Sequence, residues 1–257
     1  MGTQWLRAAA IAALAAASVQ AQAASVTLTG WAFGAGNSVQ TTTFSGAAGG
    51  FRGSLTGTGA SVAGAVDTAS FITYCIELSE SFHFGTSPIG DYNVVAGASY
   101  FQSRRSDAGI ADRLGRLMTW VADNPTRVDS AAESTSMQLA IWNLVYDNDW
   151  SLTTTVGFRD SSTFGSYADT LLAGASSITA SRYDVFALER VGNQDFLLAT
   201  QRPARSSITS GSASSPVPEP ASLALVVAAL AGLGLTGKLA RKLSRKRAVS
   251  RAGAAAT

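Results

Sequence analysis

The chain has 257 residues, of which 46% are hydrophobic, with 19 basic and 17 acidic side chains. A single cysteine and a single histidine exclude an internal disulfide and a zinc site built from these ligands. Eight of the 19 basic residues lie before residue 24 or after residue 237, which leaves 11 against 17 acidic residues and a net charge of −6 between them. That balance gives no support for nucleic-acid binding.

The N-terminus has the pattern of a secretory leader. Arg7 precedes an apolar run over residues 8–17, which is too short to span a membrane. Ala21 and Ala23 place small residues where signal peptidase needs them for cleavage after Ala23. We therefore expect a signal peptide over residues 1–23 and an exported mature chain.

Residues 24–205 are long enough for one domain with a sizeable core. Its first part is predicted to be β. Residues 26–33 alternate between apolar and polar side chains and are followed by glycine-rich turns. Residues 71–78 give the strongest strand pattern, and residues 92–95 predict another.

The middle of the domain changes to helical spacing. The apolar stripe from Ile110 to Val121 predicts a helix that Asn124 and Pro125 end. Ser130 and Glu133 form a capping-box pattern at the start of a second helix, and residues 167–173 predict a short third one. Strands are expected again at 183–188 and 195–198. The order indicates an α+β domain, a β-sandwich or barrel carrying an inserted unit of two to three helices.

A polar Ser/Thr-rich linker, residues 206–215, leads to a three-part C-terminus. Pro218, Glu219 and Pro220 directly precede the uncharged run 221–237, which would be roughly 25 Å long as a transmembrane helix. A basic tail, residues 238–251, follows it and predicts a cytoplasmic C-terminus. Its cationic side chains include Lys238, Arg241, Lys242, Arg245, Lys246 and Arg247.

Residues 216–247 resemble the PEP-CTERM sorting signal of Gram-negative bacteria. The resemblance implies processing by an exosortase-type enzyme near the Pro-Glu-Pro motif, after an intermediate stage anchored in the inner membrane. It also implies a final place at the cell surface or in the extracellular matrix, in the company of exopolysaccharide and biofilm. The alternative is an ordinary C-terminal membrane anchor, which would not require the Pro-Glu-Pro motif.

Two further segments carry a second resemblance. Cys75 lies on the strand predicted at 71–78, and Gln138 lies in the run Met137-Gln138-Leu139-Ala140-Ile141-Trp142 on the second predicted helix. The pair resembles the thioester domain of bacterial surface adhesins, in which a strand cysteine joins the glutamine of a Thr-Gln-x-Ala-(Ile/Val)-Trp motif. Met137 stands where that motif has threonine. The resemblance covers about residues 71–200 and implies that Cys75 supplies the sulfur and Gln138 the acyl carbon.

These resemblances imply an adhesin with a thioester between Cys75 and Gln138. An amine or hydroxyl of a surface target, or of exopolysaccharide, could attack this bond. Every lysine lies in the C-terminal tail, so the domain has no ε-amine of its own to consume a thioester. The alternative is a structural, biofilm-associated protein with no reactive bond, in which Cys75 is a core residue and Gln138 an ordinary polar one. Trp142 is interpreted as core. No catalytic set, cofactor or metal site is expected, so we do not expect an enzyme.

Overall fold

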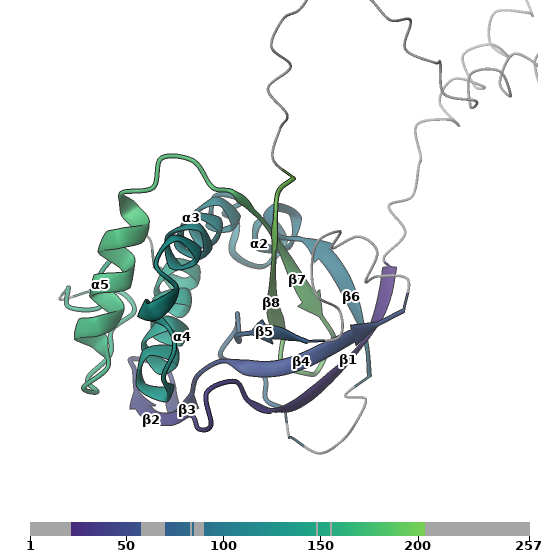
Figure 1. Cartoon of the computed structure of the whole chain (residues 1–257), viewed down its shortest axis with the longest axis horizontal. Helices are drawn as coiled ribbons and strands as arrows, with labels where there is room; N and C mark the ends of the chain where they lie inside the picture. Colours follow the sequence, from purple (N-terminus) through teal and green to yellow (C-terminus); the bar gives the residue numbers. More distant parts are fainter. Residues whose placement is uncertain are drawn as a thin grey trace, which may run out of the picture. The chain divides into compact units, whose positions relative to one another are not determined.

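The computed structural model describes residues 22–57, 70–82, 84, 90–147, 149–154 and 156–203. This part of the chain is an α+β domain with one large sheet, a small hairpin and four α-helices (Figure 1). Its elements are β1 (Gln22–Trp31), β2 (Asn37–Gln40), β3 (Ser45–Ala48), β4 (Phe51–Thr56), β5 (Phe71–Thr73), β6 (Gly90–Ala96), α2 (Gly97–Arg105), α3 (Ile110–Asp123), the 3-10 turn η2 (Pro125–Arg127), α4 (Ala131–Tyr146), α5 (Gly165–Ser176), β7 (Tyr183–Glu189) and β8 (Phe196–Gln201).

The large sheet has the strand order β5-β4-β1-β6-β7-β8, and every pair in it is antiparallel. Along β1, Ala24, Val26 and Leu28 are buried while the residues between them are less so, the period of two that gives a strand one core-facing side. The separate hairpin β2–β3 lies beside α4 (Figure 1).

All four helices are inserted between β6 and β7, and α3, α4 and α5 lie together on one side of the sheet (Figure 1). The predicted stripe of α3 is buried at Ile110, Leu114 and Leu117. The helix ends at Asp123, where Pro125 offers no backbone N–H to continue it.

Helix α4 has the predicted capping box. The Ser130 Oγ accepts the Glu133 N–H at 3.3 Å, and the Glu133 carboxylate accepts the Ser130 N–H at 3.1 Å. Every residue from 134 to 145 is buried, because β2–β3, α3 and α5 all pack around this helix. Polar side chains on α4 must therefore find partners inside the domain.

The edge strands β5 and β8 meet at one point. The Leu197 N–H donates to the Tyr74 carbonyl at 2.9 Å and the Ile76 N–H donates to the Asp195 carbonyl at 3.1 Å, which makes Cys75 and Phe196 an isolated antiparallel bridge. No longer ladder joins β5 to β8, so the sheet does not close into a barrel.

The α+β class and the helical insertion are confirmed, whereas the expectation of a sandwich or barrel is wrong. The described residues form one open sheet and a two-stranded hairpin. The described part of the insertion contains four helices, where two or three were expected. The helix that was not predicted is α2, whose sequence lacks a marked apolar stripe. The strand expected over 71–78 is also too long: β5 ends at Thr73, because beyond it the chain makes only the bridge at Cys75.

Among the described residues no helix is both long enough and apolar enough to cross a membrane. The predicted transmembrane run 221–237 lies outside them. So do the linker 206–215, the Pro-Glu-Pro motif, the basic tail 238–251 and most of the signal peptide.

Changing Ser130→Ala is expected to lower the free energy of unfolding by about 1 kcal/mol, because it removes the side-chain half of the capping box on α4. Urea unfolding followed by circular dichroism measures the change. Ser166→Ala, at an exposed position in the first turn of α5, is the matched control and should stay within about 0.5 kcal/mol of the wild type. Equal losses in both variants would contradict the capping role.

Candidate functional site at Cys75 and Gln138

The bridge between the sheet edges fixes the direction of the Cys75 backbone. The Tyr74 carbonyl and the Ile76 N–H form the hydrogen bonds of this bridge. In an extended chain the N–H and carbonyl of Cys75 therefore point to the opposite side. On that side β4 begins only at Phe51, opposite Thr73, and no strand reaches Cys75. Two buried backbone groups therefore need a partner from outside the sheet.

Gln138 on α4 supplies both bonds. The Cys75 N–H donates to the Gln138 Oε1 at 2.9 Å, and the Gln138 Nε2 donates to the Cys75 carbonyl at 2.8 Å. The two residues are 63 positions apart in the sequence, and their exposed fractions are 7% and 1%. The side-chain amide thus takes the place of a neighbouring strand, and the two residues of the predicted pair lie in direct contact.

Neighbouring contacts hold α4 in this register. The Gly50 N–H, in the turn that enters β4, donates to the Ser134 Oγ at 2.8 Å. A Cβ atom at Gly50 would lie 2.8 Å from the Tyr74 ring, so only glycine lets the turn pass this close. Thr135 donates to the Ala48 carbonyl at 2.9 Å. One face of α4 therefore binds the backbone of the turn before β4 and of the strand extension at Cys75.

The Cys75 thiol is free and buried. Burial raises its pKa well above the ordinary value, and the nearby Glu77 carboxylate adds to the increase. The sulfur is therefore a neutral thiol at neutral pH. Any reaction with the adjacent amide therefore requires the thiol to lose its proton during the attack, since no standing thiolate is present.

A cavity of about 230 Å³ opens onto this pair. Six aromatic residues contribute to its wall, and the side chains that line it among the described residues include the carboxylates Glu77 and Glu80 but no Lys or Arg. The rings pack edge to face, for example Phe51 against Phe82 with centroids 4.8 Å apart. The aromatic residues of the wall are Trp31, Phe44, Phe51, Phe82, Phe84 and Trp142. An acyl group formed here would be shielded from most water.

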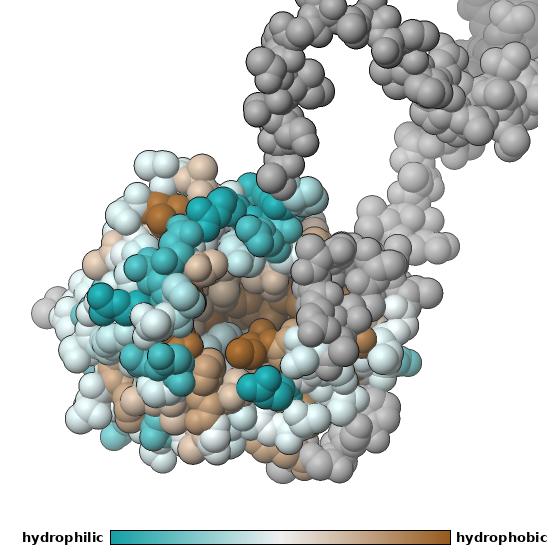
Figure 2. All heavy atoms as spheres, viewed as in Figure 1, coloured by the Kyte–Doolittle hydropathy of each residue, from teal (hydrophilic) through white to brown (hydrophobic). Residues whose placement is uncertain are grey.

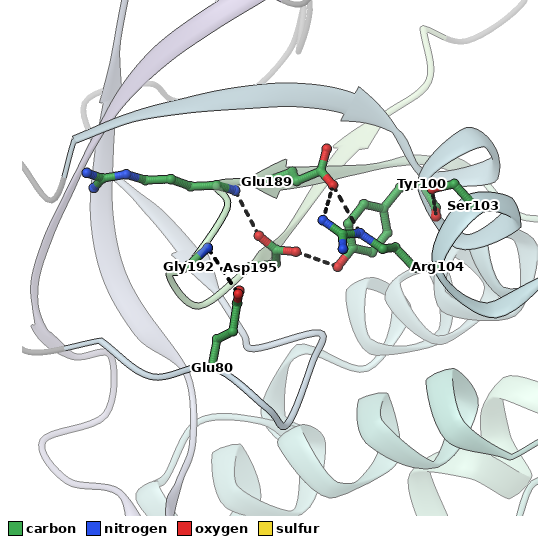
Figure 3. A network of polar contacts seen from close by, with 8 residues as sticks. Glu80, Tyr100, Ser103, Arg104, Glu189, Gly192 and Asp195 are labelled. Atoms are coloured by element: carbon green, nitrogen blue, oxygen red, sulfur yellow. Dashed lines mark hydrogen bonds and ion pairs between the residues drawn. The ribbon is translucent and has the colours of Figure 1, made fainter.

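Next to the bridge residue Phe196, the buried carboxylate of Asp195 lies at the centre of a network of polar contacts (Figure 3). Asp195 accepts the Tyr100 hydroxyl at 2.6 Å and the Arg190 N–H at 2.8 Å, while its own carbonyl accepts the Ile76 N–H. Burial is the main cause that raises the pKa of Asp195 to about 6. The carboxylates of Glu189 and Glu80 contribute to this increase, and the hydrogen bonds from Tyr100 and Arg190 oppose it. The sequence placed Asp195 on a strand without showing that it would be buried.

A second cavity, of about 250 Å³, lies between α3, α4 and the two sheet edges. Figure 2 shows apolar residues gathered in the hollow on this face, surrounded by polar ones. Ile72, Met118 and Met137 belong to its wall, and none of the described residues that line it is charged. Among the described residues, Cys75 and Gln138 line the aromatic cavity and not this one.

Of the other predicted site residues, only Ala23 belongs to the described part of the chain. Ala23 lies in β1, where it pairs with Asn93, and Ala21 lies outside the described residues. The sorting motif at 218–220 and the cationic residues of the tail lie outside them as well.

Comparison of the chain with protein-family models, with curated proteins and with solved structures gives no significant match in any of the three. The assignment of a function therefore depends on the residues and their contacts.

The buried Asp195 predicts a pH effect on stability. Its pKa is raised on folding, so the folded state holds the proton more tightly than the unfolded chain. Its contribution is fully present below about pH 4 and is lost as the pH rises through about 6, a change of roughly 1–2 kcal/mol.

Asp195→Asn keeps an acceptor for the Arg190 N–H and a hydrogen-bonding group for Tyr100 but does not titrate. Urea unfolding of both proteins between pH 4 and 7 should show the stability of the wild type falling relative to Asp195→Asn as the pH rises. A difference between the two proteins that does not vary with pH would contradict this assignment.

Proposed function

We propose that the chain is an exported surface or extracellular-matrix protein whose domain binds a partner covalently through a thioester between Cys75 and Gln138. The observation that supports this most strongly is the pair of hydrogen bonds, at 2.9 and 2.8 Å, by which the Gln138 amide faces the Cys75 backbone. The contact brings together the two residues that the adhesin motif would join.

Formation of the thioester requires no cofactor. The Cys75 Sγ adds to the Gln138 Cδ, the Cδ–Nε2 bond breaks, and the thiol proton leaves with the nitrogen as ammonia. The Cys75 N–H at 2.9 Å from Oε1 stabilises the negative charge that develops on this oxygen during the addition. The balance requires one proton on the leaving nitrogen, and the thiol supplies it because the sulfur must lose its proton as it adds to the carbon.

Attachment reverses the roles. An amine or hydroxyl of the target adds to the same carbon, the C–S bond breaks, and the proton of the nucleophile returns the Cys75 sulfur to a thiol. The product is an amide or ester between Gln138 and the target. Each molecule reacts once, so the protein is an adhesin and not an enzyme. Because the domain contains no lysine, it does not spend the acyl group on its own ε-amines.

The aromatic cavity gives the reaction its surroundings. Low polarity strengthens the hydrogen bond from the Cys75 N–H and slows hydrolysis by limiting water. The carboxylates Glu77 and Glu80 on the wall, which has no Lys or Arg among its described residues, disfavour an anionic nucleophile. Neutral hydroxyls and amines are therefore the classes that this cavity admits.

The C-terminal segments complete the proposal with a route. The motif Pro218-Glu219-Pro220, the apolar run 221–237 and the basic tail would hold the exported domain at the inner membrane until an exosortase-type enzyme processes it. The domain would then reach the exopolysaccharide layer, where it could bond to a target.

Intact mass spectrometry of the chain, purified without added amines, tests the thioester. The wild type should be one ammonia lighter than its sequence, and Cys75→Ala should have its full mass. Cys75→Ala is a matched control because both Gln138 bonds are made to the backbone of residue 75 and survive the change. Addition of methylamine should open the thioester and raise the mass of the wild type by one methylamine.

A full-mass wild type that has been kept from hydrolysis would contradict the thioester and leave the structural, biofilm-associated protein. Gln138→Ala is a less clean variant. It should also remove the mass deficit, but it leaves two buried backbone groups unpaired at about 1–3 kcal/mol each.

Replacing Pro218, Glu219 and Pro220 by alanine tests the sorting route in a Gram-negative host that has an exosortase. The variant should accumulate uncut in the inner-membrane fraction, because the apolar run and basic tail remain while the motif is lost. Cell fractionation and immunoblotting measure this. Pro216→Ala, outside the motif, should be processed like the wild type; equal processing of the motif variant would show that the segment is an ordinary anchor.

A further inference from the structure

Trp142 lies one helical turn after Gln138 on α4, at the i+4 position, so the two side chains share a face of the helix. Its exposed fraction is 3%, and its ring packs against Phe44 and Phe158 at centroid distances of 5.0 and 6.4 Å. Both Trp142 and Gln138 line the aromatic cavity. Helical side chains lean over the preceding turn, which directs Trp142 toward the turn that carries Gln138.

The indole Nε1 of Trp142 is buried and has no hydrogen-bond partner in the described part of the chain. A buried indole N–H normally finds an acceptor, and leaving one unpaired costs about 1–3 kcal/mol. The donor belongs to a side chain of the reactive cavity. An acceptor that appears only during the reaction would explain why it is unpaired in the resting state.

The reaction creates such an acceptor. Addition of the Cys75 sulfur, or of the target nucleophile, to the Gln138 Cδ converts the carbonyl oxygen into an oxyanion. In the resting state this oxygen accepts one hydrogen bond, from the Cys75 N–H at 2.9 Å. Sites that stabilise an oxyanion commonly use two donors placed in advance.

We propose that the indole N–H of Trp142 is the second donor to the Gln138 oxygen, and that it acts with the Cys75 N–H when negative charge develops there. This inference rests on the proposed thioester. Its consequence is that the donor assists both steps, since formation and attachment pass through an oxyanion on the same atom. It stabilises the oxygen whatever the nucleophile is, so its removal should slow amines and hydroxyls alike.

The test compares Trp142→Phe with the wild type in the rate at which methylamine opens the thioester, followed by intact mass over a range of methylamine concentrations. Loss of one oxyanion donor is expected to lower the maximal rate by about 100-fold. The concentration that gives half the maximal rate should stay unchanged. Trp120→Phe, on α3 and outside the cavity, should react like the wild type.

Two results would overturn the inference while the proposed function stands. One is a wild-type rate in Trp142→Phe. The other is a raised half-saturating concentration with an unchanged maximal rate, which would show that Trp142 binds the acceptor instead. A wild type without the ammonia deficit would overturn the thioester itself, so the two failures are distinguishable.

A second variant separates the lost N–H from lost packing. 3-Benzothienylalanine at position 142 keeps the two fused rings and replaces the N–H by sulfur. It should react with methylamine as slowly as Trp142→Phe does. If the lost donor slows thioester formation so much that no thioester accumulates, both variants should instead be folded and have the full mass of their sequences. A wild-type rate with this residue would show that ring volume, and not the donor, matters.

Discussion

The architecture depends on the need to pair the buried N–H and carbonyl of Cys75. The bridge to β8 uses the backbone of Tyr74 and Ile76, and β4 does not extend far enough to reach Cys75 from the other side. The Gln138 primary amide presents one acceptor and one donor on the same side and meets both needs. Because Gln138 is fixed on a helix buried on all sides, this pair of bonds sets the position of α4 against the sheet.

Local sequence signals were enough to predict the helices whose ends have side-chain chemistry of their own. The capping box at Ser130 and the stop at Pro125 act within one turn, so α3 and α4 could be placed from the sequence. Strands β2, β3 and β4 could not, because a stretch such as Ser45–Ala48 is rich in small residues and gains its ladder from a distant or adjacent partner. The strand predicted over 71–78 was too long for the same reason: its local pattern does not show that the ladder partner ends opposite Thr73.

The candidate site shows a similar division. The pairing of Cys75 with Gln138 came from motif resemblance, because spacing in the sequence says nothing of a contact across 63 positions. Trp142 was interpreted as core, which describes its burial but not its unpaired nitrogen. The burial of Asp195 depends on Tyr100, which lies on α2, a helix whose sequence lacks an apolar stripe. The unpaired nitrogen of Trp142 and the burial of Asp195 both result from tertiary packing, which the local sequence does not show.

The same geometry bears on which product the site stabilises. In a thioester the Gln138 nitrogen is gone, so the Cys75 carbonyl loses the donor that now lies at 2.8 Å. An unpaired buried carbonyl costs about 1–3 kcal/mol, which raises the energy of the thioester form relative to the resting amide. In the proposed mechanism an amine leaves a secondary amide whose trans form carries the target, not an N–H, at the position that faces the Cys75 carbonyl. A hydroxyl leaves an ester oxygen there, so neither product restores the donor. Under the proposed function, the backbone of Cys75 therefore favours the resting Gln138 amide over the thioester and over either product.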